Sequence, residues 1–253
     1  MTLAGRVALV DGVENLVSLT VARQLAKAGC SVVTSSRGGS EAPWRQDLEA
    51  AGIAVVVADT STPDGAQQVS MEAEARFGRL DILVNTAGVY QASRFAEALG
   101  SSLDTCTSLL AANVRAPFML ARACAKPLSI SAVGGAIVNL TSADALPMNG
   151  RPINRPGEDV FSATRWAMNG LTAAWARTLA PTIKVNALCL DADLLYDRGY
   201  KRPEERIEAA ADLAALLCAL LLDSRTGENV LAQPGRRTLP PQAPPHRRIS
   251  GVA

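Results

Sequence analysis

Short apolar runs alternate with longer amphipathic stretches over the first 230 or so residues. The short runs are rich in Val, Ile and Leu, which indicates strands buried on both faces. They predict seven strands, at Val7–Val10, Ser31–Ser35, Ala54–Ala58, Ile82–Asn85, Ala136–Leu140, Lys184–Leu188 and Asn229–Ala232. The longer stretches predict helices at Leu16–Ala28, Pro63–Phe77, Leu103–Lys126, Asp159–Ala180 and Pro203–Leu222. This alternation is typical of a doubly wound α/β fold, with a parallel sheet covered by helices on both faces.

No linker or charge block divides this pattern, so residues 1–233 are predicted to form a single domain. The remainder, residues 234–253, reads "PGRRTLPPQAPPHRRISGVA" and forms a Pro/Arg-rich C-terminal extension that holds the only histidine, His246. Most such tails are solvated. Docking on a neighbouring subunit or an anionic ligand is the alternative, and the sequence leaves it open.

The bulk composition excludes several classes of function. The chain has 25 basic and 24 acidic residues, so it exerts no net electrostatic attraction on nucleic acid or an anionic membrane. The start "MTLAGRVALVDG" does not look like a signal peptide and the longest apolar run, Leu213–Leu222, is too short to span a bilayer, so we expect a cytoplasmic protein. Five scattered cysteines without a CxxC pair indicate neither disulfides nor a metal site, but reduced and mostly buried thiols at positions 30, 106, 124, 189 and 218.

Five short motifs occur in a recognisable order: "VALVDG", "NTAG", "IVNLTS", "FSATR" and "TGENVLAQPG". In this order they resemble the short-chain dehydrogenase/reductase family over roughly residues 5–238. The resemblance implies a Rossmann-like fold with the ligand crevice at the carboxyl ends of the strands. It also implies the machinery of an NAD(P)-dependent oxidoreductase: a glycine-rich turn after the first strand, an Asn-Asn-Ala-Gly element, and an Asn-Ser-Tyr-Lys catalytic set.

The glycine-rich turn is degenerate. The family pattern is Thr-Gly, three residues, then Gly-x-Gly, whereas this chain has Asp11 and Gly12 followed by Leu16 and Ser18 at the later glycine positions. Glycines let the backbone approach a pyrophosphate, so we expect Leu16 to occupy the place of the phosphate. Asp11, and Glu14 beside it, add like charge. At about 4 Å each repulsive pair costs about 1 kcal/mol in water and about 4 kcal/mol at a surface-like dielectric, against about 0.3–1 kcal/mol from the helix dipole.

We therefore expect the isolated chain to bind neither NADH nor NADPH; an altered loop conformation that admits a nucleotide remains the alternative. At the end of the second strand, Ser36 and Arg37 look like an NADP-selecting pair, because a guanidinium can pair with a 2′-phosphate. An ordinary surface arginine is the favoured interpretation. Asp59, at the family's adenine contact, and Asn85 to Gly88 ("NTAG") are retained, but these residues also stabilise the sheet and its turns.

The catalytic set is half preserved. Asn113 matches the family's helix asparagine and Ser142 its substrate-orienting serine, whereas Phe161 and Arg165 replace the tyrosine and lysine. Phe161 has no ionisable atom, so it cannot exchange a proton with a carbonyl. Arg165 shares its helix face at i+4, but a guanidinium does not reproduce a flexible ammonium. General acid/base catalysis contributes about 10²–10⁴-fold, and another group would have to supply it.

No replacement group is evident. The candidates are Asp144, Arg151, Arg155, Glu158 and Asp159 in the long insertion before Phe161, and Tyr90, Tyr196 and Tyr200 elsewhere. Each is more simply explained as a loop charge or a half-buried aromatic. The segment "LCLDADLLYDRGYKRPEER" also lacks the proline-glycine turn that leads into the family's substrate loop, which indicates a reduced lid.

These defects favour a catalytically silent family member that acts as a structural or regulatory subunit beside an intact homologue, which would carry the NAD(P). It resembles heteromeric members such as the two-subunit (hydroxyphenylmethyl)succinyl-CoA dehydrogenases. An NADP-dependent oxidoreductase with displaced catalytic groups, and a non-redox enzyme or small-molecule sensor, are the alternatives. In the family the two long helices pair across a two-fold axis, so we expect a hetero-oligomer, such as a tetramer, joined by a stripe that includes Ala167, Leu171, Ala174, Trp175 and Leu179.

Overall fold

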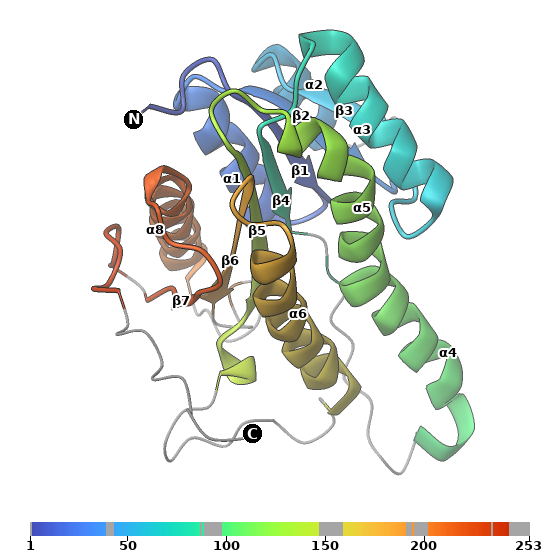
Figure 1. Ribbon diagram of the computed structural model, residues 1–253. Helices are drawn as coiled ribbons and strands as arrows, with labels where there is room; N and C mark the ends of the chain where they lie inside the picture. Colours follow the sequence, from blue (N-terminus) through green and yellow to red (C-terminus); the bar gives the residue numbers. More distant parts are fainter. Residues whose placement is uncertain are drawn as a thin grey trace, which may run out of the picture.

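Seven parallel strands form the centre of the molecule (Figure 1). The computed structural model describes residues 2–38, 43–86, 88, 98–146, 159–190, 194, 202–233 and 235–242. The strands are β1 (Val7–Asp11), β2 (Ser31–Ser36), β3 (Ala54–Val57), β4 (Ile82–Asn85), β5 (Gly135–Ser142), β6 (Ile183–Leu190) and β7 (Asn229–Leu231), in the order β3-β2-β1-β4-β5-β6-β7. This confirms the predicted doubly wound, Rossmann-like sheet, and all seven predicted strands are present.

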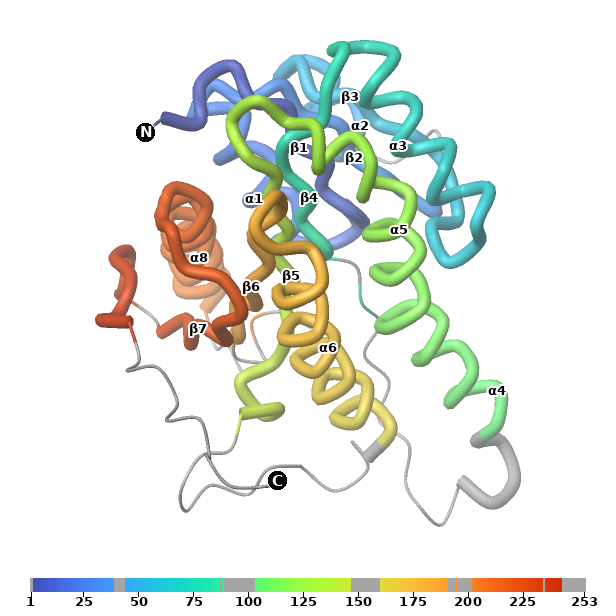
Figure 2. Tube along the Cα trace, in the orientation of Figure 1, coloured from blue at the N-terminus to red at the C-terminus, as the bar shows by residue number. Residues whose placement is uncertain are grey.

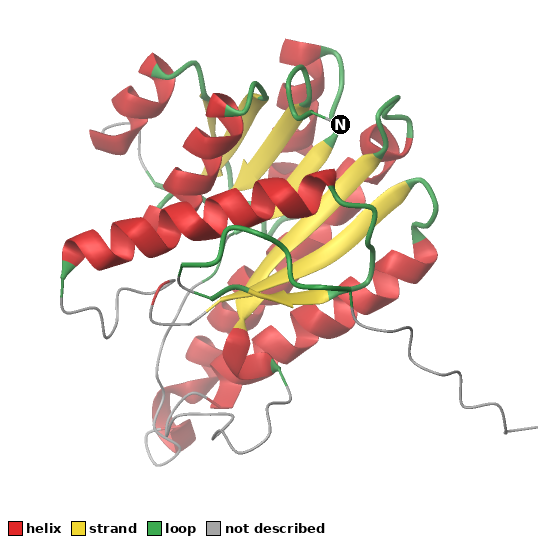
Figure 3. Ribbon diagram, turned by 90° about the vertical axis from the view of Figure 1, so that its left-hand side faces the viewer, coloured by secondary structure: helices red, strands yellow, loops and turns green. Residues whose placement is uncertain are grey.

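Helices cover both faces of this sheet (Figure 3). They are α1 (Leu16–Lys27), α2 (Pro43–Ala50), α3 (Pro63–Phe77), α4 (Ala98–Leu110), α5 (Ala116–Ser129), α6 (Asp159–Thr178) and α8 (Pro203–Leu222). Helices α1, α2 and α8 contribute to one apolar core, and α3, α5 and α6 to the other. Successive side chains of a strand belong to opposite cores: Ala8 and Val10 face the first, and Val7 and Leu9 the second.

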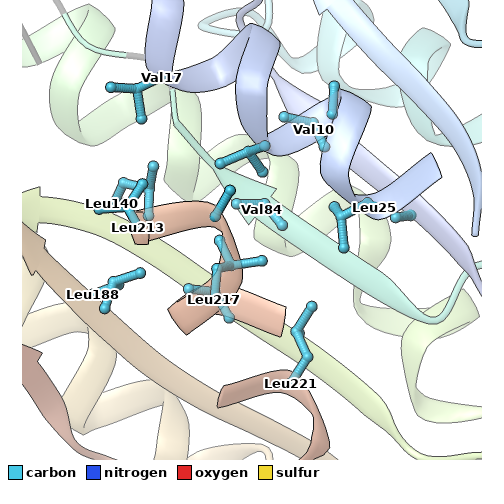
Figure 4. Packing of buried hydrophobic residues seen from close by; sticks show 14 of the residues in the cluster. Val10, Val17, Leu25, Val84, Leu140, Leu188, Leu213, Leu217 and Leu221 are labelled. Carbon is cyan, nitrogen blue, oxygen red and sulfur yellow. The ribbon is translucent and has the colours of Figure 1, made fainter. Parts of the chain in front are cut away.

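The core beneath α1 and α8 shows how regularly spaced apolar residues of a helix pack together (Figure 4). Three leucines spaced four residues apart on α8, Leu213, Leu217 and Leu221, are buried against the sheet, where Leu140 and Leu188 are also buried. A four-residue spacing places these side chains on one face of the helix. Burial of each leucine stabilises the fold by about 1.5–3 kcal/mol relative to an exposed side chain.

Two helices differ from the sequence-based expectation. Helix α2 was not predicted, because a short segment with only Trp44 and Leu48 directed to the core carries little periodic signal. The single helix expected over Leu103–Lys126 is instead α4 and α5, joined by a π-helical segment, Ala111–Arg115. Pro117, in the first turn of α5, lacks a backbone N–H, so the regular hydrogen-bond pattern changes before it.

Among the described residues, no helix is both long and apolar enough to cross a bilayer, and no cluster of ligands suited to a metal ion is present. All five cysteines are free. Cys30, Cys124 and Cys189 are buried, and burial raises the pKa of the Cys189 thiol to about 12. These side chains therefore behave as small apolar core residues.

The first part of the C-terminal extension is hydrogen-bonded to the domain, although most of its described residues are exposed. The carboxylate of Asp212, which α8 holds almost completely buried, accepts hydrogen bonds from the Gly235 N–H at 2.9 Å and from Arg237 Nε at 2.5 Å. Leu239 packs against the α8 side of the core. Gly235, Arg237 and Leu239 thus contact the domain, and His246 lies outside the described residues.

We predict that Asp212→Ala will detach this segment, because it removes both acceptors and leaves the Gly235 N–H without a partner. Trypsin should then cleave after Arg236 and Arg237 faster than in the wild type, as followed by mass spectrometry. The free energy of unfolding should fall by about 1–3 kcal/mol. The exposed Glu74→Gln on α3 is the control and should change neither quantity. Equal cleavage rates in wild type and Asp212→Ala would contradict the docking role.

Candidate functional site

A cavity of about 460 Å³ lies at the carboxyl end of β1. The strand order reverses at this strand, where β2 and β4 flank β1, and ligands of doubly wound sheets bind at such a point. We call it the β1 cavity; its lining is Asp11, Gly12, Glu14, Asn15, Ser35, Arg37, Gly38, Ala58, Thr60 and Gly88. The fold thus gathers the sequence-predicted positions Asp11, Gly12, Arg37 and Gly88, whereas Leu16, Ser18, Asp59 and Asn85 are not part of the lining.

Three backbone donors in and after the turn at the end of β1 have acceptors within the protein. Gly12 has a φ of 76°, a conformation that favours glycine, and its N–H donates to Ser35 Oγ at 2.9 Å. The Val13 N–H donates to the Ser35 carbonyl at 3.2 Å. Asn15 is the N-cap of α1, and its Oδ1 accepts from the Ser18 N–H at 3.0 Å. Protein groups therefore occupy donors that the start of a helix otherwise offers to a phosphate.

Leu16 does not lie where the sequence analysis placed it. It is the first residue of α1, and its side chain packs against the core shared by α1 and α8 instead of lining the cavity. Ser18 is fully buried, and its hydroxyl donates to the Asn15 carbonyl at 3.0 Å. Leu16 therefore does not fill the cavity, and the acidic residues of its lining are Asp11 and Glu14.

Asp11 is the most unusual group of the cavity. Its side chain is 1% exposed; Oδ1 accepts from Ser35 Oγ at 2.5 Å, and Oδ2 has no hydrogen-bond partner within the described structure. Burial raises the pKa of Asp11 to about 6, opposed by the Ser35 and Thr60 hydroxyls and by Arg37, while Glu14 adds to the rise. The Thr60 hydroxyl is near enough to lower the pKa, but its geometry falls short of a hydrogen bond to Oδ2.

A second carboxylate, that of Glu14, lies at the end of β2. Glu14 Oε1 accepts the Arg37 backbone N–H at 2.7 Å, and both residues are exposed. Arg37 lines the β1 cavity, so it is more than a remote surface arginine. Ser36 is buried, and its hydroxyl accepts from the Gly38 N–H at 3.0 Å. The place where the resemblance puts a 2′-phosphate partner thus also holds the Glu14 carboxylate.

Asp59 and Asn85 take part in hydrogen bonds of the framework. Asp59 Oδ1 accepts the Ser61 N–H at 3.0 Å, and hydrogen bonding with Ser61 holds the pKa of Asp59 below its ordinary value. Asn85 Nδ2 donates to Asn139 Oδ1 at 2.7 Å, and Asn139 Nδ2 donates to Thr172 of α6 at 2.8 Å. This chain of amides ties β4 and β5 to α6, as expected of residues that stabilise the sheet.

Phe161 and Arg165 share one face of α6, as predicted, and that face is buried. Phe161 is 1% exposed and Arg165 2%. The guanidinium carbon of Arg165 lies 5.0 Å from the centre of the Phe161 ring, a cation–π arrangement that contributes roughly 0.5–2 kcal/mol. The two side chains that replace the catalytic tyrosine and lysine therefore pack on each other.

The two retained catalytic positions are engaged locally. Ser142 Oγ lies 3.1 Å from Asp144 Oδ2 and accepts the Asp144 N–H at 3.1 Å, which caps a short turn after β5. Asn113 is buried in the π-helical segment, and its Nδ2 donates to Thr164 Oγ1 at 3.1 Å. Both residues thus have structural roles, Asn113 in the π-helical segment and Ser142 in the turn after β5.

Several candidate residues lie outside the described structure: Tyr90, Arg151, Arg155, Glu158, Tyr196, Tyr200 and most of the segment predicted as a reduced lid. Asp159 begins α6. The sequence analysis missed Ser35 and Thr60, the two residues whose hydroxyls act on Asp11. They lie at the ends of other strands and carry no local sequence signal. It also missed Asn15, although an Asn three residues before Ser18 at the start of a helix is a recognisable N-cap pattern.

The raised pKa of Asp11 predicts a pH-dependent stability. A carboxyl with a pKa of 3.8 in the unfolded chain and about 6 in the folded chain stabilises the fold fully below about pH 4. This contribution, about 3 kcal/mol, is lost as the pH rises through 6. Asp11→Asn should remove this loss of stability. In urea titrations, the unfolding free energy of the variant relative to that of the wild type should therefore increase from pH 4 to pH 7. Exposed Asp64→Asn is the control; a constant difference for Asp11→Asn would contradict the assignment.

Comparisons with known proteins agree with this architecture. Residues 6–192 match the sequence model of the family described as short chain dehydrogenase. The chain is 32% identical over 191 residues to an uncharacterized oxidoreductase of Methylorubrum extorquens, covering 74% of this chain and 72% of the relative. It is 32% identical over 189 residues to the galactitol 2-dehydrogenase (L-tagatose-forming) of Cereibacter sphaeroides, covering 74% and 70%.

Solved structures give the same picture. A short-chain dehydrogenase/reductase from Serratia marcescens superposes with a TM-score of 0.76 at 25% identity, covering 94% of this chain and 100% of that one. A blue fluorescent protein from a metagenomic library, solved in complex with NADPH, superposes with a TM-score of 0.75 at 25% identity, covering 93% and 99%. Sequence match, strand order and overall structure together establish that the chain belongs to the short-chain dehydrogenase/reductase family.

Proposed function

We propose that this chain is a catalytically silent member of the family, which acts as a structural or regulatory subunit of a hetero-oligomeric NAD(P)-dependent alcohol dehydrogenase or ketoreductase. The observation that carries the proposal is the buried pair on α6. Phe161, at the position of the family's proton-transferring tyrosine, has no ionisable atom and packs under the Arg165 guanidinium. A proton donor for a carbonyl is therefore missing at the place where the family has one.

The β1 cavity supports the same proposal from the cofactor side. The donors of Gly12, Val13 and Ser18 are bonded to protein acceptors, and the carboxylates of Asp11 and Glu14 line the cavity. Both features disfavour a dinucleotide phosphate. On this proposal no cofactor is bound by this chain, and the intact partner carries the NAD(P).

The outer face of α4, α5 and α6 provides a surface for that partner. Four large apolar side chains are exposed there, at 77% for Leu103, 45% for Leu110, and 40% each for Phe118 and Trp166. Between the helices lies a largely apolar groove of about 440 Å³, bordered by Leu110, Phe118 and Leu171 among others. Exposed apolar patches of this kind are typical of protein–protein interfaces.

The stripe predicted on α6 serves two surfaces. Leu171 borders the groove and Ala167 is exposed, whereas Trp175 and Leu179 pack against the core of their own domain. Trp175 also contacts the Phe118 ring, with 6.3 Å between the ring centres. The outer surface is thus narrower than the whole stripe and is extended by α4 and α5, which lie beside α6 (Figure 2).

The alternative is an NADP-dependent oxidoreductase with displaced catalytic groups. Its support is Arg37 on the lining of the β1 cavity, together with relatives that are named dehydrogenases and a structural neighbour in complex with NADPH. A non-redox enzyme or small-molecule sensor that uses the same crevice is a further alternative. Measurements of assembly and of cofactor binding distinguish these functions.

For assembly, we predict that co-expression with an intact homologue encoded nearby gives a mixed complex, and that replacing the partner's own catalytic tyrosine abolishes its activity. Phe118→Asp should prevent the complex, because it places a charge in the apolar surface. Ile207→Asp on α8, also an exposed apolar side chain, is the matched control and should leave the complex intact. Size-exclusion chromatography with light scattering measures the outcome. A partner that is equally stable and active alone would contradict the subunit role.

For the cofactor, we predict no appreciable binding of NADH or NADPH to the isolated chain in calorimetric titrations. The double substitution Phe161→Tyr and Arg165→Lys should also fail to create reductase activity, because the donors of the turn after β1 remain occupied. A dissociation constant in the low micromolar range, about −8 kcal/mol of binding free energy, or turnover by the double variant would instead support the oxidoreductase alternative.

A further inference from the structure

Asp11, which belongs to the lining of the β1 cavity, has a buried carboxylate oxygen without a hydrogen-bond partner among the described residues. Asp11 is 1% exposed and lines the cavity, yet its Oδ2 accepts no hydrogen bond from any described residue, whereas its Oδ1 is bonded to Ser35 Oγ. Buried polar atoms are nearly always paired, and an unpaired one costs about as much as a lost hydrogen bond. The unpaired atom therefore marks a place where a ligand can supply a donor.

The charges around the cavity indicate which donor. Its described lining contains two acidic side chains, Asp11 and Glu14, and one basic side chain, Arg37, so its formal balance is negative. The groups that act on Asp11 are the Ser35 and Thr60 hydroxyls, the Glu14 carboxylate and the Arg37 guanidinium. Together with burial they place the pKa of Asp11 at about 6, so the carboxyl is mostly ionised near pH 7. A buried carboxylate in this state lacks a close countercharge on Oδ2.

We propose that the β1 cavity binds a small organic cation, an ammonium or amidinium compound, whose N–H group donates to Asp11 Oδ2. The cation supplies both the missing donor and the missing countercharge, and charge-assisted hydrogen bonds of this kind are the strong ones. The Ser35 and Thr60 hydroxyls offer further polar contacts, and a cavity of about 460 Å³ has room for a molecule of this size.

The same features select against anions. A phosphate or carboxylate would face Asp11 and Glu14, and the backbone donors at Gly12 and Ser18 are already bonded within the protein. The inference concerns ligand binding by this chain alone and holds whether or not the chain is a silent subunit. The site would then be the crevice of the family with a preference for cationic ligands in place of anionic ones.

The test uses the full chain and three compounds of one shape: benzamidine (a cation), benzamide (neutral) and benzoate (an anion), measured by calorimetry at pH 7. We expect saturable binding of benzamidine, weaker binding of benzamide and none of benzoate. Asp11→Asn should weaken benzamidine binding at least about tenfold, because a charge-assisted hydrogen bond is lost. Asp64→Asn, an exposed residue on α3, should leave the affinity unchanged.

A pH series on the wild type provides a second readout that needs no substitution. The benzamidine affinity should fall from pH 7 to pH 5, because Asp11 takes up a proton near pH 6 while the amidinium stays charged. Three outcomes would each overturn the proposal. They are no saturable benzamidine binding up to about 10 mM, a benzamidine affinity that does not change with pH or with Asp11→Asn, and binding of an anion, benzoate or the nucleotide AMP, that is tighter than that of benzamidine. NADPH titration of the same sample tests the proposed function separately.

Discussion

Burial of a parallel sheet on both faces is the constraint on which this molecule depends. Because successive side chains of a strand point in opposite directions, the central strands are buried on both faces and mostly apolar. β1 illustrates this, with Ala8 and Val10 in one core and Val7 and Leu9 in the other. Polar residues inside the strands, such as Asn139 in β5, are hydrogen-bonded, whereas β1 ends in the acidic Asp11 at the carboxyl edge of the sheet.

At that edge, the polar groups that survive are used to hold elements together. The amides of Asn85 and Asn139 connect two strands to Thr172 on α6, and Asn113 reaches Thr164 from the π-helical segment. Each bond satisfies a buried polar atom, which is a structural requirement whether or not a ligand binds. Retention of a family residue is thus weak evidence for retained catalysis, whereas replacement of an ionisable group by Phe161 directly removes a chemical capability.

The β1 cavity and the buried pair on α6 differ from the family pattern in two different ways. At α6, Phe161 and Arg165 fill the space with a packed, buried pair. At β1, by contrast, the cavity persists while its donors are occupied and its lining is acidic. The α6 position is thus filled by its own side chains, whereas the end of β1 retains a cavity of about 460 Å³.

The sequence by itself determined the doubly wound fold class, all seven strands, most helices and the absence of an ionisable group at position 161, because hydrophobic periodicity and residue identity are local properties. It could not determine that Leu16 packs inward, that Asp11 keeps one oxygen unpaired between Ser35 and Thr60, or that residues 235–242 dock on Asp212. These outcomes depend on contacts between segments far apart in the chain. Only the tertiary structure decides them, because burial and hydrogen-bond geometry are fixed when the separate strand ends and helices meet.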